Sequence, residues 1–177
     1  MSNAPEAVLQ DQDGRAMLRF ERVLPHPPEK VWRALTERDE LASWHPSLPE
    51  FEPVAGGTVT YSPEGGWQPP DGEVTDYDPP RVLGYTWGED HLRWEVQPRE
   101  DGCALVLVHT FDDRFKAARD AAGWQMCLDN LSRLLDGAQK PPGEEPGEVP
   151  PEWSALNRQY ETLFGIPPEK ATPPPGR

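Results

Sequence analysis

The chain has 177 residues and a formal net charge of −14 at pH 7, with 31 acidic residues against 17 lysines and arginines. Nucleic acids and anionic membrane surfaces bind clustered lysine and arginine, so this charge and the lack of a basic run argue against both partners. The sequence has no signal peptide and no apolar run of about 18 residues or more, so we expect no membrane insertion and a cytoplasmic protein.

The first part of the chain predicts a strand followed by two short helices. Residues 1–15 are mostly polar and indicate a flexible leader. Residues 16–24 alternate apolar and charged side chains, which predicts a strand that ends at Pro25. The prolines at 27–28 favour the first turn of a helix, and Thr36 is a suitable cap for a second one.

The middle of the chain predicts an antiparallel sheet. Six short β-like runs are separated by Gly, Pro and Asp turns with no helix between them, which is typical of a meander. With the first strand they give a sheet of about seven strands. The six runs are Phe51–Val54, Thr58–Ser62, Gly72–Tyr77, Arg81–Trp87, His91–Gln97 and Cys103–Phe111.

A long amphipathic helix is predicted between Asp112 and Gly137. Apolar side chains recur at helical spacing from Trp124 to Leu135, so one side of this helix is meant for burial. A single helix covers the concave face of such a sheet only if the sheet curls around it. Side chains either fill the space between them or line a pocket, and the sequence leaves both outcomes open. Residues 16–137 thus form an α+β domain.

The remaining residues are predicted to be an appendage to this domain. Residues 138–151 are rich in Pro, Gly and Glu and indicate an extended linker. Residues 152–165 repeat the pattern of an amphipathic helix, Glu152–Phe164, ended by a glycine. Because so short a helix is marginal alone, we expect it to dock on this domain or to form a homodimer with a second copy. Residues 166–177 are expected to be disordered.

Residues 19–137 resemble the START-like, or polyketide cyclase and dehydrase, superfamily, and most closely the homologues of the activator of heat-shock protein 90 ATPase. The resemblance rests on the order and spacing of several weak motifs. They are Pro-Pro-Glu-Lys-Val-Trp-Arg-Ala-Leu-Thr at 27–36, Leu41 to Trp44, Gly56-Gly57, Gly72-Glu73-Val74 with Asp78-Pro79-Pro80, and Gly123-Trp124 with Leu128 and Leu131. The resemblance implies a helix-grip fold, in which a curved sheet wraps the C-terminal helix and encloses a cavity for a hydrophobic or amphipathic molecule.

Ten residues are candidates for the lining of this cavity. His109 shares strand parity with Leu105 and Leu107, so it should lie on the same face, where it would orient or protonate a ligand; the alternative is a structural histidine. The tryptophans would build an aromatic pocket or simply fill the core. Trp67 lies in a Gly- and Pro-rich loop and is a candidate lid. The full set is Trp44, Trp67, Tyr85, Trp87, Trp94, Leu105, Leu107, His109, Trp124 and Leu128.

Three functions remain open at this stage. The leading interpretation is a noncatalytic domain that binds or carries a small hydrophobic ligand. The second is a cyclase- or dehydratase-like enzyme, which would place a carboxylate, tyrosine or histidine beside His109. The third is a module that modulates a chaperone, which we do not expect because the N-terminal domain of the eukaryotic activators has no counterpart here. Histidine and cysteine spacing predicts no metal site, and no nucleotide-binding or hydrolase motif indicates a cofactor.

Overall fold

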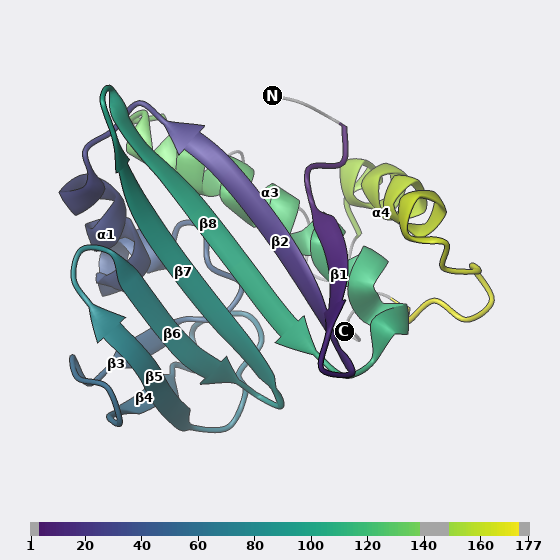
Figure 1. Ribbon diagram of the computed structural model, residues 1–177, viewed down its shortest axis with the longest axis horizontal. Coiled ribbons are helices and arrows are strands. Elements are labelled where there is room, and N and C mark those ends of the chain that lie inside the picture. The colour runs from purple at the N-terminus through teal and green to yellow at the C-terminus, as the bar shows by residue number, and fades with distance from the viewer. Residues whose placement is uncertain (1–3, 139–148, 174–177) are drawn as a thin grey trace.

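The computed structural model describes residues 4–138 and 149–173, and its main feature is an eight-stranded antiparallel sheet curved around a long helix (Figure 1). The strand order is β1-β2-β8-β7-β6-β5-β4-β3. The strands are β1 (Val8–Gln12), β2 (Arg15–Leu24), β3 (Pro49–Phe51), β4 (Thr58–Tyr61), β5 (Gly72–Asp78), β6 (Val82–Trp87), β7 (Asp90–Arg99) and β8 (Gly102–Phe111). The predicted helix-grip fold is confirmed, with eight strands instead of about seven.

The additional strand lies in the segment that the sequence indicated as a flexible leader, so that prediction is wrong for residues 8–12. β1 pairs with β2 through a turn at Asp13 and Gly14, whose φ angles are 53° and 82°. Positive φ at both turn residues is the mark of a tight hairpin, and Asp-Gly is a preferred pair for it. The strand itself has no buried residue and therefore no alternating pattern.

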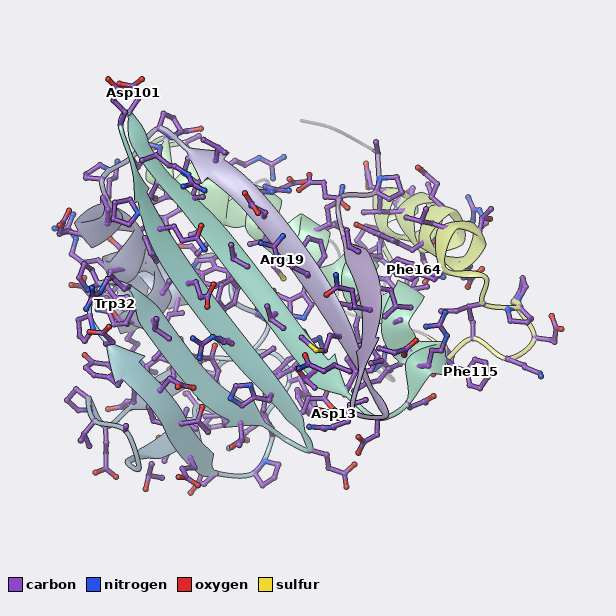
Figure 2. All side chains as sticks on the ribbon, viewed as in Figure 1. Asp13, Arg19, Trp32, Asp101, Phe115 and Phe164 are labelled. Atoms are coloured by element: carbon purple, nitrogen blue, oxygen red, sulfur yellow. The ribbon has the colours of Figure 1, made fainter. Side chains whose placement is uncertain are left out.

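The central strands place the predicted inward residues on one face. β8 lies between β2 and β7, and in its register with β7 Leu92 is opposite His109 and Trp94 is opposite Leu107. Because side chains alternate along a strand, Leu105, Leu107 and His109 share the concave face. Figure 2 shows Asp13 and Asp101 at the turns on opposite ends of this part of the sheet.

The long helix covers the concave face. The helices are α1 (Pro28–Thr36), α2 (Arg38–Leu41), the single 3-10 turn η1 (Arg114–Lys116), α3 (Ala117–Leu135) and α4 (Pro151–Phe164). The side chain of Asp113 accepts a hydrogen bond from the backbone N–H of Phe115, 3.0 Å away, and so caps the 3-10 turn that precedes α3. The stripe from Trp124 to Leu135 is buried against the sheet.

The C-terminal helix α4 packs on the outer side of α3, within the same chain (Figure 1). Tyr160 is fully buried, and its hydroxyl accepts from the backbone N–H groups of Glu6 and Ala7 at 2.9 and 3.0 Å. The same hydroxyl donates to Gln125 of α3. One phenol thus joins α4, α3 and the N-terminal segment. Of the two expected arrangements, docking on this domain or on a second copy, the structure shows the first.

Two further expectations concern the segments beside α4. Most of the predicted linker 138–151 lies outside the described residues, and α4 begins at its last residue. The tail was expected to be disordered from residue 166, yet Ile166 is 4% exposed and the backbone N–H of Thr172 donates to the carbonyl of Phe115 over 3.1 Å. Ordered contacts therefore continue past α4. Among the described residues, no helix is long and apolar enough to cross a membrane.

Candidate functional site

The space between α3 and the concave face holds a continuous column of tryptophans. Trp67 is 51% exposed and meets Trp87 edge to face, with ring centroids 4.8 Å apart. Trp87 lies 5.3 Å from Trp124, which is 5.6 Å from Trp94, and Trp94 is 5.4 Å from Trp44. The column, defined by these five residues, runs from the surface into the buried interior.

Each buried or half-buried indole of the aromatic column donates its N–H to a specific acceptor. Tryptophan is enriched where its ring is buried and its N–H finds a partner, so these bonds fix the orientation of the rings. The acceptors are the Ala34 carbonyl for Trp44 (2.8 Å), Ser47 Oγ for Trp87 (3.0 Å), the Tyr85 hydroxyl for Trp94 (3.2 Å) and His109 Nδ1 for Trp124 (3.0 Å).

His109 lies at the centre of a hydrogen-bonded chain and is fully buried. Its Nδ1 accepts from Trp124, and its Nε2 is 2.8 Å from Oδ2 of Asp90. An indole nitrogen can only donate, so Nδ1 must carry the lone pair and the ring proton must sit on Nε2, facing Asp90. His109 is therefore a neutral imidazole with both nitrogens engaged.

Asp90 receives a second partner, Lys116, whose ammonium donates to the same Oδ2. Burial by itself would raise the pKa of the Asp90 carboxyl, but the hydrogen bonds from His109 and Lys116 and the positive charge of Lys116 hold it below its usual range. Asp90 is thus ionised at neutral pH. The sequence pointed to neither residue, because Asp90 was assigned to a turn and Lys116 to the start of a helix.

Within 4–138 and 149–173, the atoms of Asp90, His109 and Asp120 lie within 4.8 Å of one another, close enough in principle for a metal ion. Two observations argue against that use. The ammonium of Lys116 already pairs with Asp90 and lies 3.7 Å from Asp120. Nε2 of His109 carries a proton in this arrangement, whereas a ligating nitrogen needs its lone pair. We therefore interpret the cluster as an ion-pair network.

His45 is a second buried histidine, which the sequence did not single out. Its Nε2 is 2.9 Å from the Tyr85 hydroxyl and its Nδ1 is within hydrogen-bond reach of the Ser47 backbone. Burial lowers the pKa of His45 to about 3, so the ring is neutral. Burial also raises the pKa of the Tyr85 phenol well above its usual value. The interior beside the aromatic column is thus polar but uncharged here.

The structure brings nine of the ten predicted residues into the interior and places Trp67 over its edge. Leu105 and Leu107 lie on the concave face of β8, and Leu128 belongs to the buried stripe of α3. Phe51, which the candidate set lacked, packs on Tyr85 with ring centroids 4.8 Å apart.

The loop that carries Trp67 is held at the edge of this interior. The carbonyl of Trp67 accepts from Ser47 Oγ at 2.6 Å, and its backbone N–H donates to the Pro46 carbonyl at 3.2 Å. Its ring lies over Gly88, where an added Cβ would come within 3.1 Å of the indole. Gly88 also has a φ of 64°, so both the backbone conformation and the close approach of the Trp67 ring favour glycine there.

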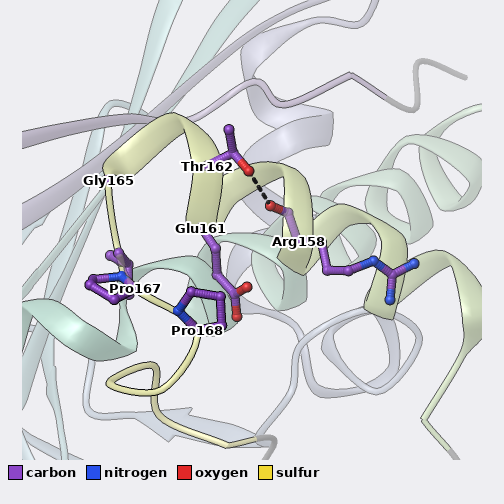
Figure 3. A pocket seen from close by; sticks show the side chains of 7 residues that line it. Arg158, Glu161, Thr162, Gly165, Pro167 and Pro168 are labelled. Atoms are coloured by element: carbon purple, nitrogen blue, oxygen red, sulfur yellow. Dashed lines mark hydrogen bonds between the residues drawn. The ribbon is translucent and has the colours of Figure 1, made fainter.

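A surface groove of about 440 Å³ lies away from this interior, at the C-terminal end of α4 (Figure 3). Its lining comprises Arg158, Glu161, Thr162, Gly165, Ile166, Pro167 and Pro168. The hydroxyl of Thr162 is turned back onto the carbonyl of Arg158, 3.1 Å away.

The sequence matches the family model described as "Activator of Hsp90 ATPase homolog 1-like protein" over residues 25–136, which is more than half of the chain. The chain belongs to this family. The matched region begins before α1 and ends with α3, so it includes every residue of the interior site described above, but not strands β1 and β2. No curated protein matches the sequence.

Several solved structures share the fold of this chain. EF2215 of Enterococcus faecalis, a protein of unknown function, is 22% identical with a TM-score of 0.69, covering 93% of this chain and 94% of its own. CalU16 of Micromonospora echinospora is 19% identical with a TM-score of 0.65, covering 90% and 95%. MLL2253 of Mesorhizobium loti is 28% identical with a TM-score of 0.60, covering 68% and 97%. The likeness to the first two reaches beyond the residues that the family model matches.

Proposed function

We propose that this chain binds a small hydrophobic or amphipathic molecule between α3 and the concave face of the sheet, without changing it chemically. The observation that supports this most is the aromatic column, which connects the exposed ring of Trp67 with buried rings around His109. Ligand sites of this kind combine apolar walls with a few placed polar groups. Tyr85, His45 and His109 supply such groups here.

Binding at this site requires the interior to open, because the rings of the column contact one another in the present state. The loop around Trp67 is the element that we assign to this opening. It carries the exposed end of the column, and lids of binding sites are commonly surface loops. A ligand would then take the place of the Trp67 ring against Trp87.

An enzyme remains the second candidate function, because Asp90 stands beside His109 as an acid–base pair would require. The same geometry limits this use. Both ring nitrogens of His109 have partners and the side chain is fully buried, so it can accept a proton from a ligand only after Trp124 moves away. We therefore rank ligand binding above catalysis.

The family description names an activator of the Hsp90 ATPase. We do not assign that activity to this chain, because a shared fold carries many unrelated functions and only the description supports the assignment.

The proposal can be tested with N-phenyl-1-naphthylamine, a neutral probe whose fluorescence rises in apolar surroundings. We expect saturable binding with one probe per chain, accompanied by quenching of tryptophan emission. Trp67→Ala should speed both association and dissociation, because it removes the ring that covers Trp87. Val23→Ala is the matched control, since Val23 is 74% exposed and points away from α3. Absence of saturable binding, or equal rates in Trp67→Ala and the control, would contradict the proposal.

A further inference from the structure

The interior contains a hydrogen-bond acceptor, Nδ1 of His109, and the neighbouring side chains determine that this nitrogen accepts and does not donate. Because Nδ1 of His109 carries the lone pair, a group that approaches this nitrogen must donate a proton. A neutral imidazole can place its proton on either nitrogen, and the partner of the other nitrogen decides which. Here that partner is an ionised carboxylate, Asp90, which can only accept.

The carboxylate is itself held in place. Lys116 donates to the same oxygen of Asp90 that receives the His109 proton, and the side chains of Asp90 and Lys116 are only 11% and 17% exposed. The ion pair therefore keeps the proton of His109 on Nε2. This arrangement fixes Nδ1 as an acceptor whether or not Trp124 occupies it.

The present occupant of Nδ1 belongs to the column that we propose opens. Trp124 donates its indole N–H to Nδ1 over 3.0 Å and lies against Trp87, with ring centroids 5.3 Å apart. Trp87 also stands 5.6 Å from the His109 ring. A ligand that enters beneath Trp67 and displaces Trp87 or Trp124 would therefore meet the imidazole next.

We propose that the ligand carries an uncharged hydrogen-bond donor, a hydroxyl or phenol group on an apolar skeleton, which replaces the indole N–H of Trp124 at Nδ1 of His109. This inference rests on the proposed function. A buried acceptor that loses its donor and gains none costs free energy, so a molecule without a donor is penalised at this position. A carboxylate head group is rejected for the same reason, because its lone pairs would face the lone pair of Nδ1.

The test compares two probes of similar shape, 2-naphthol, which has a donor hydroxyl, and 2-methoxynaphthalene, which has none. Dissociation constants are measured by calorimetry or by competition with N-phenyl-1-naphthylamine. The wild-type protein should prefer 2-naphthol by roughly threefold to tenfold, as expected for one hydrogen bond in a buried site. His109→Phe keeps an aromatic ring but removes the acceptor, so the preference should disappear.

Two further variants keep the test decisive if His109→Phe does not fold. Trp124→Phe removes the competing indole N–H, so it should bind 2-naphthol more tightly than the wild type does. Trp32→Phe is its control, because Trp32 lies in α1 and packs on Tyr77, outside the column. Trp32→Phe should leave the preference for 2-naphthol over 2-methoxynaphthalene unchanged. Variants are compared only when their circular dichroism spectra match that of the wild type.

The outcomes separate the two proposals. Equal affinity of the wild type for both probes, or no gain in Trp124→Phe, would overturn the donor requirement while leaving ligand binding intact. Failure of both probes and of N-phenyl-1-naphthylamine to bind would overturn the proposed function, and the donor requirement with it.

Discussion

Trp124 of α3 donates its indole N–H to Nδ1 of His109 in β8 over 3.0 Å, between side chains that are 3% and 0% exposed. This bond joins the long helix to the central strand of the sheet. The same imidazole is hydrogen-bonded to Asp90. The packing of α3 on the sheet and the hydrogen-bonding groups of the interior therefore depend on the same side chain. Substitutions here are therefore expected to affect both stability and binding.

His109→Leu should lower the free energy of unfolding by about 2–3 kcal/mol, because it leaves the Trp124 N–H and one contact of Asp90 without a partner in a buried site. Urea unfolding followed by circular dichroism measures the change. His91→Leu is the control, since His91 lies on the outer side of β7 and bonds Thr75 Oγ1 at 2.7 Å. The control should cost less than about 1 kcal/mol, and equal losses in both variants would contradict the account.

The stability of the protein should fall in mild acid because of His45. Burial lowers the pKa of this residue to about 3, whereas a histidine in an unfolded chain titrates at about 6.5. Between these values the unfolded chain binds a proton that the folded chain does not, so the free energy of unfolding decreases as the pH falls through this window. The decrease is at most about 1.4 kcal/mol per pH unit from this group.

This pH effect is measured by urea unfolding of the wild type and of His45→Gln across the same pH range. Glutamine can still reach the Tyr85 hydroxyl but does not titrate, so the variant should show a shallower loss of stability with acid. A variant with the same slope as the wild type would show that His45 is not the group responsible.

Gly88→Ala should disturb the position of the Trp67 ring and not only the backbone. Gly88 has a φ of 64°, and a Cβ would come within 3.1 Å of the Trp67 ring. Gly137 has a φ of 74° with nothing within 4 Å of such a Cβ, so Gly137→Ala matches the backbone strain without the clash. Each variant should lose about 1 kcal/mol of stability. Only Gly88→Ala should shift the tryptophan emission spectrum, and identical spectra would argue against the placement of Trp67.

Tyr160→Phe should loosen the N-terminal segment. The lost hydroxyl leaves the backbone N–H of Ala7 without its acceptor, at a cost of about 1–3 kcal/mol. The N–H of Glu6 and the side chain of Gln125 each lose one bond but still contact each other at 3.3 Å. Hydrogen exchange of residues 4–7 should accelerate. Leu163→Ala, on the face of α4 where the side chain is 58% exposed, should change neither exchange nor stability. Unaltered protection in Tyr160→Phe would contradict the joint role of this phenol.

Patterns within single elements predicted most of the fold. The parity of β8 placed His109 beside Leu107, and the burial of Leu92 and Trp94 in β7 follows the apolar and polar alternation of that strand in the sequence. The helical stripe around Trp124 identified the side of α3 that faces the sheet. Each of these predictions depends on the side-chain periodicity within one strand or one helix, which can be read directly from the sequence.

The remaining features depend on which elements meet, and local patterns do not encode that. Asp90, the first residue of β7, reaches His109 across 19 positions of sequence because β7 pairs with β8 and His91 is opposite Thr110. Tyr160 and Gln125 meet only because α4 docks on α3. The Asp13-Gly14 pair was a signal for the turn after β1. No residue of β1 is buried, however, so the strand lacks the apolar alternation that would support its prediction.

The most direct test of the central claim, a ligand site between α3 and the sheet, is native mass spectrometry of freshly purified protein, followed by solvent extraction of anything released. We expect a reproducible added mass from an apolar molecule that carries a hydroxyl or phenol group, and this added mass should be reduced in Trp67→Ala after dialysis. A protein that is consistently free of added mass, and stays so when 2-naphthol is supplied in excess, would contradict the claim and identify the aromatic column as a closed core.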